Sequence, residues 1–248
     1  MSHPLKRFIT LLIGAVLISS PAFAQSLSID TGGGGGSTTA SIIQLVLLMT
    51  LLSLAPSLLV MATSFTRIII VLSFVRSAIG VQNTPPNQVL VALALFLTMF
   101  IMTPVFEQSY KDGIKPLINE EVSEEEGIRA AAKPFHAFMI SHVRDKDVEL
   151  FMGMATKDLQ TDKPEDVAYQ VLLPAFMISE LKRAFEIGFL IFLPFLIIDM
   201  LVASILTAMG MVTLPPVVIS LPFKIIFFVL VDGWYMLSGS LVRSFGIS

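Results

Sequence analysis

The chain contains several long apolar stretches and one long polar stretch. Four apolar stretches lie at about 42–62, 87–106, 186–209 and 214–231. A helix needs about 20 apolar residues to cross the ~30 Å hydrocarbon core of a bilayer, so each stretch has the length of a membrane helix. Short segments join the first to the second and the third to the fourth. The pattern therefore predicts two long helical hairpins.

The polar stretch, residues 107–184, separates the two hairpins. It holds 15 acidic and 10 basic side chains, a net charge of −5. Ser123 followed by Glu126 forms the sequence of a capping box, which marks a helix start. Apolar residues recur at helical spacing beyond it, and no alternating strand pattern competes. We therefore expect an all-α membrane protein, with about four membrane-length helices and a helical periplasmic segment.

The first 24 residues have the pattern of a cleaved signal peptide. Lys6 and Arg7 precede a short apolar run at 8–18, and Ala22-Phe23-Ala24 provides the small residues of a cleavage site. A glycine-rich segment follows at 25–41, which is typical of a flexible linker.

Charge then suggests the orientation of the hairpins. A cleaved signal leaves the mature N-terminus outside, so the segment carrying Arg67 and Arg76 would be cytoplasmic by the positive-inside rule. The expected organisation is a signal peptide at 1–24, a linker at 25–41, a first hairpin at 42–106, a periplasmic region at 107–184 and a second hairpin at 185–248.

The apolar stretch that begins near Ser41 continues to Ile79, about twice the length of one span. As a straight helix it would reach about 58 Å, although Pro56 offers a kink. This excess length suggests that protein, rather than lipid, covers part of it.

Composition excludes several function classes. The chain is 54% hydrophobic and 14% charged, whereas soluble domains are about 25% charged. The net charge of −3 gives no reason to expect nucleic acid binding, and there are no cysteines. His136 and His142 are six residues apart and lack companion ligands, so we expect no metal site. No catalytic grouping or cofactor motif stands out, so we expect no cofactor and no enzyme.

Two opposite charges interrupt the second hairpin. Lys224 and Asp199 lie at about equal distances from a turn near residue 212, roughly 18 and 20 Å along their helices. Charges inside apolar helices are costly unless paired, so we expect a buried ion pair within or between subunits. A structural role is favoured over proton or ion coupling, because a single pair makes a poor relay.

Two methionines, Met209 and Met211, flank Gly210 at that turn. Their flexible thioether side chains suit either ordinary core packing or a deformable seal around a pore. The residues alone favour packing.

Two segments carry a resemblance to a known family. Residues 173–189 and 222–234 closely resemble the signature stretches of the FliP family of flagellar export-gate proteins, whose counterparts in virulence systems form the SctR class. The signature residues are Pro174, Glu180, Pro222, Asp232, Gly233 and Trp234. The resemblance extends from about Ile42 to the C-terminus and includes the 83–87 turn.

The resemblance implies a pore-forming subunit that conducts unfolded flagellar proteins across the bacterial inner membrane. Such proteins form a ring of several copies, with five expected here. FliR-like and FliQ-like subunits join the ring, and FlhB and FlhA belong to the same apparatus. The assembly lies in the flagellar basal body, in contact with lipid, with much of it on the periplasmic side.

It also implies roles for particular residues. The pore constriction maps to Met209, Met211 and Val212, where this chain departs from a longer methionine run. Phe138 and Phe151 match aromatic residues that line or support the periplasmic channel. The charges that join subunits are Asp199, Lys224 and Arg144. Two alternatives stay open: the equivalent subunit of a virulence secretion system, or a secondary transporter or ion channel.

Overall fold

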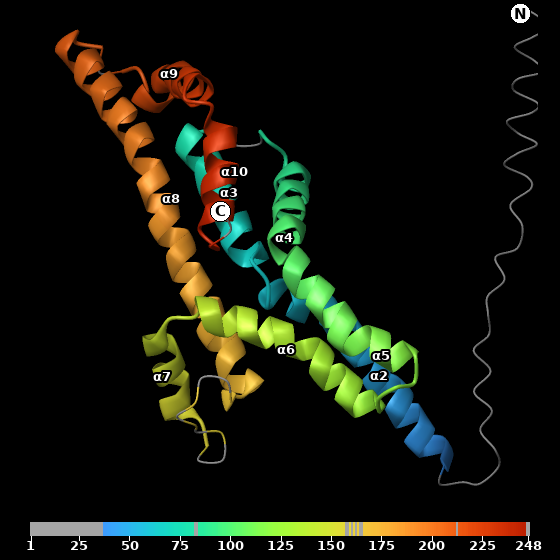
Figure 1. Cartoon of the computed structure of the whole chain (residues 1–248). Coiled ribbons are helices and arrows are strands. Elements are labelled where there is room, and N and C mark those ends of the chain that lie inside the picture. Colours follow the sequence, from blue (N-terminus) through green and yellow to red (C-terminus); the bar gives the residue numbers. More distant parts are fainter. Residues whose placement is uncertain are drawn as a thin grey trace, which may run out of the picture. The chain divides into compact units, whose positions relative to one another are not determined.

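The computed structural model describes residues 37–81, 84–156, 159, 161, 163, 166–211 and 213–246. The expected signal peptide and most of the expected linker lie outside these residues. The chain divides into two units, residues 1–53 and 54–248. All described elements are helical (Figure 1).

The helices follow in this order: α2 (Ser37–Met61), α3 (Phe65–Ile79), α4 (Asn87–Ser109), the π-helical turn η1 (Tyr110–Ile114), α5 (Lys115–Ile118), α6 (Glu124–His142), α7 (Asp145–Met154), α8 (Tyr169–Ala208), α9 (Pro216–Leu230) and α10 (Gly233–Arg243).

The long apolar stretch at 41–79 is two helices. α2 runs through Pro56 to Met61, and the helical pattern stops at Ala62–Ser64 before α3 begins. The side chains of these three residues are buried. The helix therefore breaks after the proline, at a buried segment with two hydroxyl residues, rather than at the proline itself.

Fewer helices than expected have the dimensions of a membrane span. Among the described residues, Asn87–Ile118 and Tyr169–Ala208 are long and apolar enough to cross a membrane. A third would be α9 with α10, if this pair, bent by 62°, counts as one span. The prediction of four membrane-length helices is thus more than the structure shows.

The longest helix, α8, passes through the expected boundary at residues 184–185. Its 40 residues span about 60 Å at 1.5 Å per residue. The charges near this boundary do not end the helix. Lys182 pairs with Glu186 one turn later on the surface, and Glu180 pairs with a buried arginine of α3.

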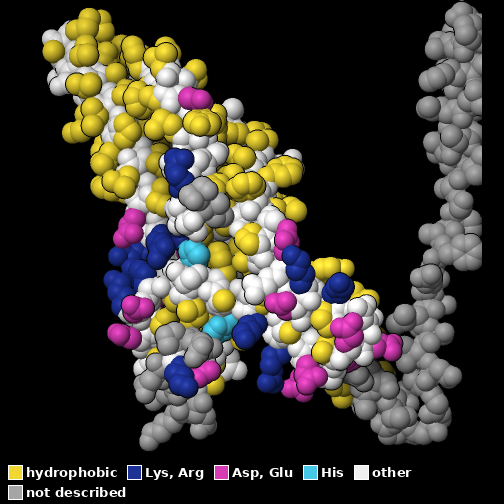
Figure 2. Space-filling view, in the orientation of Figure 1, with side chains coloured by type: hydrophobic (Ala, Val, Ile, Leu, Met, Phe, Trp, Pro, Cys, Tyr) yellow, Lys and Arg dark blue, Asp and Glu magenta, His cyan; other side chains and the backbone are white. Residues whose placement is uncertain are grey.

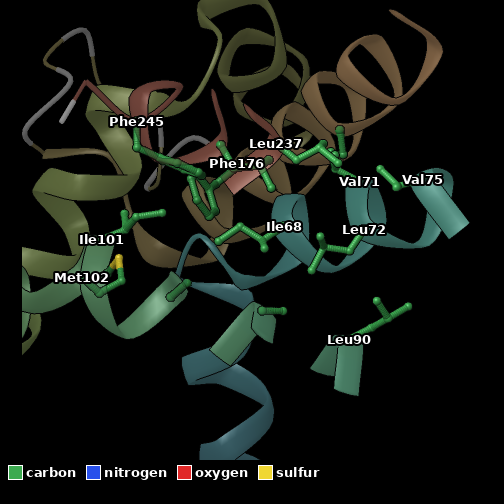
Figure 3. Packing of buried hydrophobic residues seen from close by; sticks show 14 of the residues in the cluster. Ile68, Val71, Leu72, Val75, Leu90, Ile101, Met102, Phe176, Leu237 and Phe245 are labelled. Atoms are coloured by element: carbon green, nitrogen blue, oxygen red, sulfur yellow. The ribbon is translucent and has the colours of Figure 1, made fainter. Parts of the chain in front are cut away.

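The core of the larger unit forms around α3. This helix contacts α8 and α4, and its residues Ile68, Val71, Leu72 and Val75 are fully buried at helical spacing (Figure 3). The buried partners include Leu90, Ala94, Ile101 and Met102 from α4, Phe176 from α8, and Leu237 and Phe245 from the C-terminal region.

A glycine allows α3 and α8 to approach closely. A Cβ atom at Gly188 would lie 2.5 Å from the ring of Phe74. The same ring packs edge-on against Phe185, with 5.1 Å between the ring centres. This contact fixes the register of the two helices.

The predicted capping box of α6 is confirmed. The Ser123 hydroxyl accepts the Glu126 backbone N–H, and the Glu126 carboxylate accepts the Ser123 backbone N–H at 3.2 Å. The Ser123 hydroxyl also donates to the Glu126 carboxylate at 2.8 Å, and this bond, followed by the one from the Ser123 backbone N–H, lowers the pKa of Glu126.

We expect Gly188→Ala to destabilise the protein by roughly 1–3 kcal/mol, because overpacking against Phe74 outweighs the helix propensity of alanine. Gly153→Ala is the matched control, since a Cβ there meets no atom within 4 Å. Thermal unfolding of the detergent-purified protein should show a lower midpoint for the first variant and an equal or higher one for the second. Equal midpoints for both would refute the packing argument.

Candidate functional site

The two charges of the second hairpin meet in the structure. Lys224 of α9 donates to Asp199 Oδ2 of α8 at 2.5 Å and to the Ala78 carbonyl of α3 at 3.2 Å. The other Asp199 oxygen accepts the Ser220 hydroxyl. The lysine side chain is 4% exposed. The pair therefore ties α8, α9 and the end of α3 together within one chain.

A second buried ion pair connects α3 to α8. Arg67 and Glu180 are 1% and 0% exposed, and their pairing is bidentate: Arg67 Nε donates to Glu180 Oε2 at 2.8 Å, and Nη2 donates to Oε1. Bidentate guanidinium–carboxylate pairs combine charge attraction with fixed geometry. This pair holds the N-terminal turn of α3 against the first third of α8.

The C-terminal residues complete the environment of Arg67. Its Nη1 donates to the Ser244 carbonyl at 3.1 Å and to the Ser244 hydroxyl at 3.0 Å. The guanidinium also lies 3.7 Å above the centre of the Phe245 ring, a cation–π contact. The end of α10 is thus fixed to the same ion pair as α3 and α8.

This arrangement corrects the expectation that Arg67 belongs to a loop between the first two apolar stretches. Arg67 lies inside α3 and is buried, because Glu180 and Ser244 take up its hydrogen bonds. Arg76 is partly exposed and hydrogen-bonds Asn87 across the proline turn. The signal for the pair was present in the sequence: like Lys224, Arg67 is a cation within a long apolar run.

Arg144 is also paired within the chain. Its Nε and Nη2 donate to Asp147 at 2.7 and 2.8 Å, and Asp147 also accepts the Ser179 hydroxyl at 2.5 Å. Burial by itself would raise the pKa of Asp147, but these hydrogen bonds outweigh it and the pKa lies below its ordinary value. Arg144 Nη1 is buried and has no hydrogen-bond partner among the described residues.

The two aromatic residues assigned to the channel belong to the chain's own packing. Phe138 is 9% exposed, stacks on Phe245 at 6.1 Å and meets Phe176 edge-on at 6.0 Å. Phe151 is half-buried beside the same core. These positions favour a supporting role over a lining role.

The methionines at the tip of the second hairpin are exposed. Met209 is 61% and Met211 is 42% exposed, and Gly210 between them has φ of 73°. The packing interpretation is therefore not supported within this chain, because neither thioether enters its core. Val212 lies outside the described residues.

The signature residues have distinct structural roles. Asp232 (φ 50°) and Gly233 form the 62° bend between α9 and α10. A Cβ at Gly233 would lie 2.2 Å from the Phe228 ring, which also packs edge-on against Trp234 at 5.2 Å. Pro174 and Pro222 lie within α8 and α9, and Glu180 forms the buried pair with Arg67.

Apolar side chains cover much of the surface of α8 and α9 (Figure 2). On α8 those more than half exposed are Phe185, Phe189, Leu190, Ile197, Met200, Leu201 and Ile205. Isolated soluble proteins rarely expose continuous apolar patches of this extent. The two helices therefore present surfaces that lipid or other protein must cover.

Comparison with known proteins gives consistent matches. The model of the FliP family matches residues 48–241. The flagellar biosynthetic protein FliP of Caulobacter vibrioides is 54% identical over 233 residues, covering 94% of this chain and 87% of the relative. That of Rhizobium meliloti is 49% identical over 242 residues (96% and 99%), and that of Bacillus subtilis is 54% identical over 206 (82% and 91%).

We expect Glu180→Ala to destabilise the protein by roughly 3–5 kcal/mol, because it leaves Arg67 buried and unpaired. The double variant Arg67→Leu/Glu180→Leu should recover much of this loss, since it removes both charges. Thermal unfolding in detergent measures both effects.

The control is Lys182→Ala, which breaks an exposed pair and should cost under about 1 kcal/mol. If Glu180→Ala unfolds at the same temperature as Lys182→Ala, the buried pair does not hold the helices together.

Proposed function

The chain belongs to the FliP family of flagellar biosynthetic proteins and is a component of the flagellar export apparatus of the inner membrane. On this premise we propose that it is a pore-forming subunit, which lines a passage for unfolded flagellar proteins during flagellum assembly. The passage would be enclosed by a ring of copies of this chain, with five copies expected. FliR-like and FliQ-like subunits would join the ring. FlhB-like and FlhA-like components would adjoin it, as the resemblance implies.

The observation that carries this proposal is the length of the exposed apolar surface on α8. Exposed apolar side chains extend from Ile178 to Met209, about 46 Å along the helix. Even tilted by 40°, a helix fits only about 39 Å into a 30 Å hydrocarbon layer. If the hydrocarbon layer begins at Met209, those ~39 Å end near residue 183, so Lys182 lies just outside the lipid tails and Glu186 lies among them, where its carboxylate is not accommodated. Neighbouring copies of the chain can cover both the exposed apolar side chains and the charged side chains of α8.

The exposed methionines support a constriction at one end of the passage. Met209 and Met211 extend from an open turn whose central glycine has space around it. In a ring, one such turn from each copy would bring unbranched apolar side chains to the axis. Flexible thioethers can close against ions and yet yield to a passing chain.

The buried ion pairs support a scaffold rather than an ion-coupling site. Lys224 has Asp199 and the Ala78 carbonyl, and Arg67 has Glu180 and Ser244. A transporter that moves protons needs groups that exchange partners, whereas each of these cations has several partners within its own chain. The secondary transporter is therefore the weaker alternative, and the virulence counterpart is disfavoured by the flagellar relatives.

Native mass measurement of the complex extracted in mild detergent tests the proposal. We expect one particle that contains several copies of this chain together with FliR-like and FliQ-like subunits. A particle with a single copy or a simple dimer, coupled to stoichiometric ion flux, would support the transporter instead.

A second test concerns the constriction. Met209→Ala/Met211→Ala should leave assembly intact and raise ion leakage through the complex, because the smaller side chains no longer close the axis. Planar-bilayer conductance of the purified complex measures this. Met200→Ala, on the exposed side of α8, serves as the control. Equal conductance in all three proteins would refute a methionine constriction.

A further inference from the structure

The bend between α9 and α10 exposes large side chains that the rest of the chain covers only in part. Figure 1 shows the chain leaving α9 at this point and turning back along α10. The side chains around it are Val229 (69% exposed), Leu230 (80%), Trp234 (38%), Tyr235 (77%) and Met236 (56%). We call these five residues the bend surface.

Both aromatic side chains of the bend surface carry a polar atom without a partner in the described chain. The Trp234 ring packs edge-on against Phe228 at 5.2 Å, but its indole N–H donates no hydrogen bond to a described residue. The Tyr235 hydroxyl also forms none among these residues. Tryptophan and tyrosine are enriched at membrane–water interfaces, because the ring suits lipid tails and the polar atom suits head groups or water.

A charge lies at the corner of the same surface. Asp232 is exposed, and its carboxylate forms no ion pair and does not cap α10 within the described part of the chain. No lysine or arginine occurs between Lys224, which is buried, and Arg243 at the far end of α10. A subunit that covered this corner would bury an unpaired carboxylate unless it brought a cation, and lipid tails would do the same. The carboxylate is therefore best placed in water, with the apolar side chains beside it in lipid.

The other end of α9 differs in this respect. α9 is about 22 Å long, less than the ~30 Å hydrocarbon layer, so its two ends cannot lie at opposite boundaries. No charged residue occurs between Asp199 and Lys224, a segment that contains the hairpin tip and the start of α9. Of the two ends, the bend is the one that combines an exposed charge, two amphipathic aromatic rings and apolar neighbours. This is the composition of a lipid–water boundary.

We propose that the bend surface lies at a lipid–water boundary and binds phospholipid there. Val229 and Leu230 contact the outer parts of the lipid tails. The polar atoms of Trp234 and Tyr235 hydrogen-bond to head groups, and Asp232 stays in water. The head group is zwitterionic, because the bend surface contains no cation that would favour an anionic one. This inference goes beyond the proposed function, since it concerns the depth of each copy in the membrane.

Spin labelling measures this depth, and the natural chain, which has no cysteine, gives the background from partner subunits. Leu230→Cys and Tyr235→Cys are each produced with the partners, labelled with a nitroxide and reconstituted in phosphatidylcholine bilayers. Collisions with molecular oxygen, which concentrates in lipid, and with a water-soluble nickel chelate report the surroundings of each label. We expect the oxygen-to-nickel ratio to be about threefold higher at position 230 than at position 235, because the tails surround the first and the head groups the second. Met154→Cys, exposed on α7, is the control and should collide mainly with nickel.

The charge at the corner gives an independent measure. In the Tyr235→Cys chain, Asp232→Asn removes the carboxylate, while asparagine still tolerates the left-handed φ of 50°. The bend should then move toward the tails, and the oxygen-to-nickel ratio at position 235 should rise about twofold. Glu149→Gln is the matched control: this exposed carboxylate belongs to α7, far from α9 in Figure 1, and its loss should leave the ratio unchanged. An unchanged ratio in Asp232→Asn would contradict the placement of this carboxylate in water at the boundary.

The outcomes separate this inference from the proposed function. Labels at 230 and 235 that both collide freely with nickel place the bend in water, and labels that are immobilised and reached by neither reagent place it under another subunit. Either result overturns the inference, and in a particle of full mass it leaves the ring standing. A particle with one copy whose labels show the expected ratio overturns the ring and supports the boundary.

Discussion

The structure depends on one constraint: a charge placed in an apolar helical core must find its partner inside that core. Arg67 and Lys224 meet this requirement at the two ends of α3. Arg67 pairs with Glu180 of α8, and Lys224 reaches Asp199 of α8 together with the carbonyl of Ala78. Because hydrophobic packing is non-directional, it would allow α3 to slide along α8. The two pairs, with the Gly188–Phe74 contact between them, allow only one register.

The same constraint explains how the C-terminus is positioned. After the bend at Asp232 and Gly233, α10 returns to place Ser244 and Phe245 against Arg67. Phe245 then stacks on Phe138 of α6. A single buried guanidinium therefore connects α3, α8, the C-terminal turn and, through Phe245, the polar region between the hairpins.

Much of this could be predicted from the sequence, and the misses have a common cause. Helical class, the α6 cap and the closeness of Lys224 to Asp199 follow from local patterns and equal depth on one hairpin. The Arg67–Glu180 pair joins residues 113 positions apart, so no local spacing indicates it. The sequence pattern instead places Arg67 in the segment that joins the first two apolar stretches, although its apolar flanks resemble those of Lys224. The prediction of four membrane-length helices takes each apolar run as one span, whereas a bend depends on close side-chain packing, such as Phe228 against Gly233, which a count of apolar residues does not register.

Pairing within the chain changes the view of which residues can join subunits. Asp199, Lys224 and most of Arg144 already use their hydrogen bonds internally, and breaking such pairs to form new ones would expose buried charge. The side chains that the described chain leaves exposed are different: the apolar faces of α8 and α9 and the two methionines at the hairpin tip. In the ring proposed above, these apolar faces would supply the contact area, while the buried pairs keep each subunit rigid enough for its neighbours to fit.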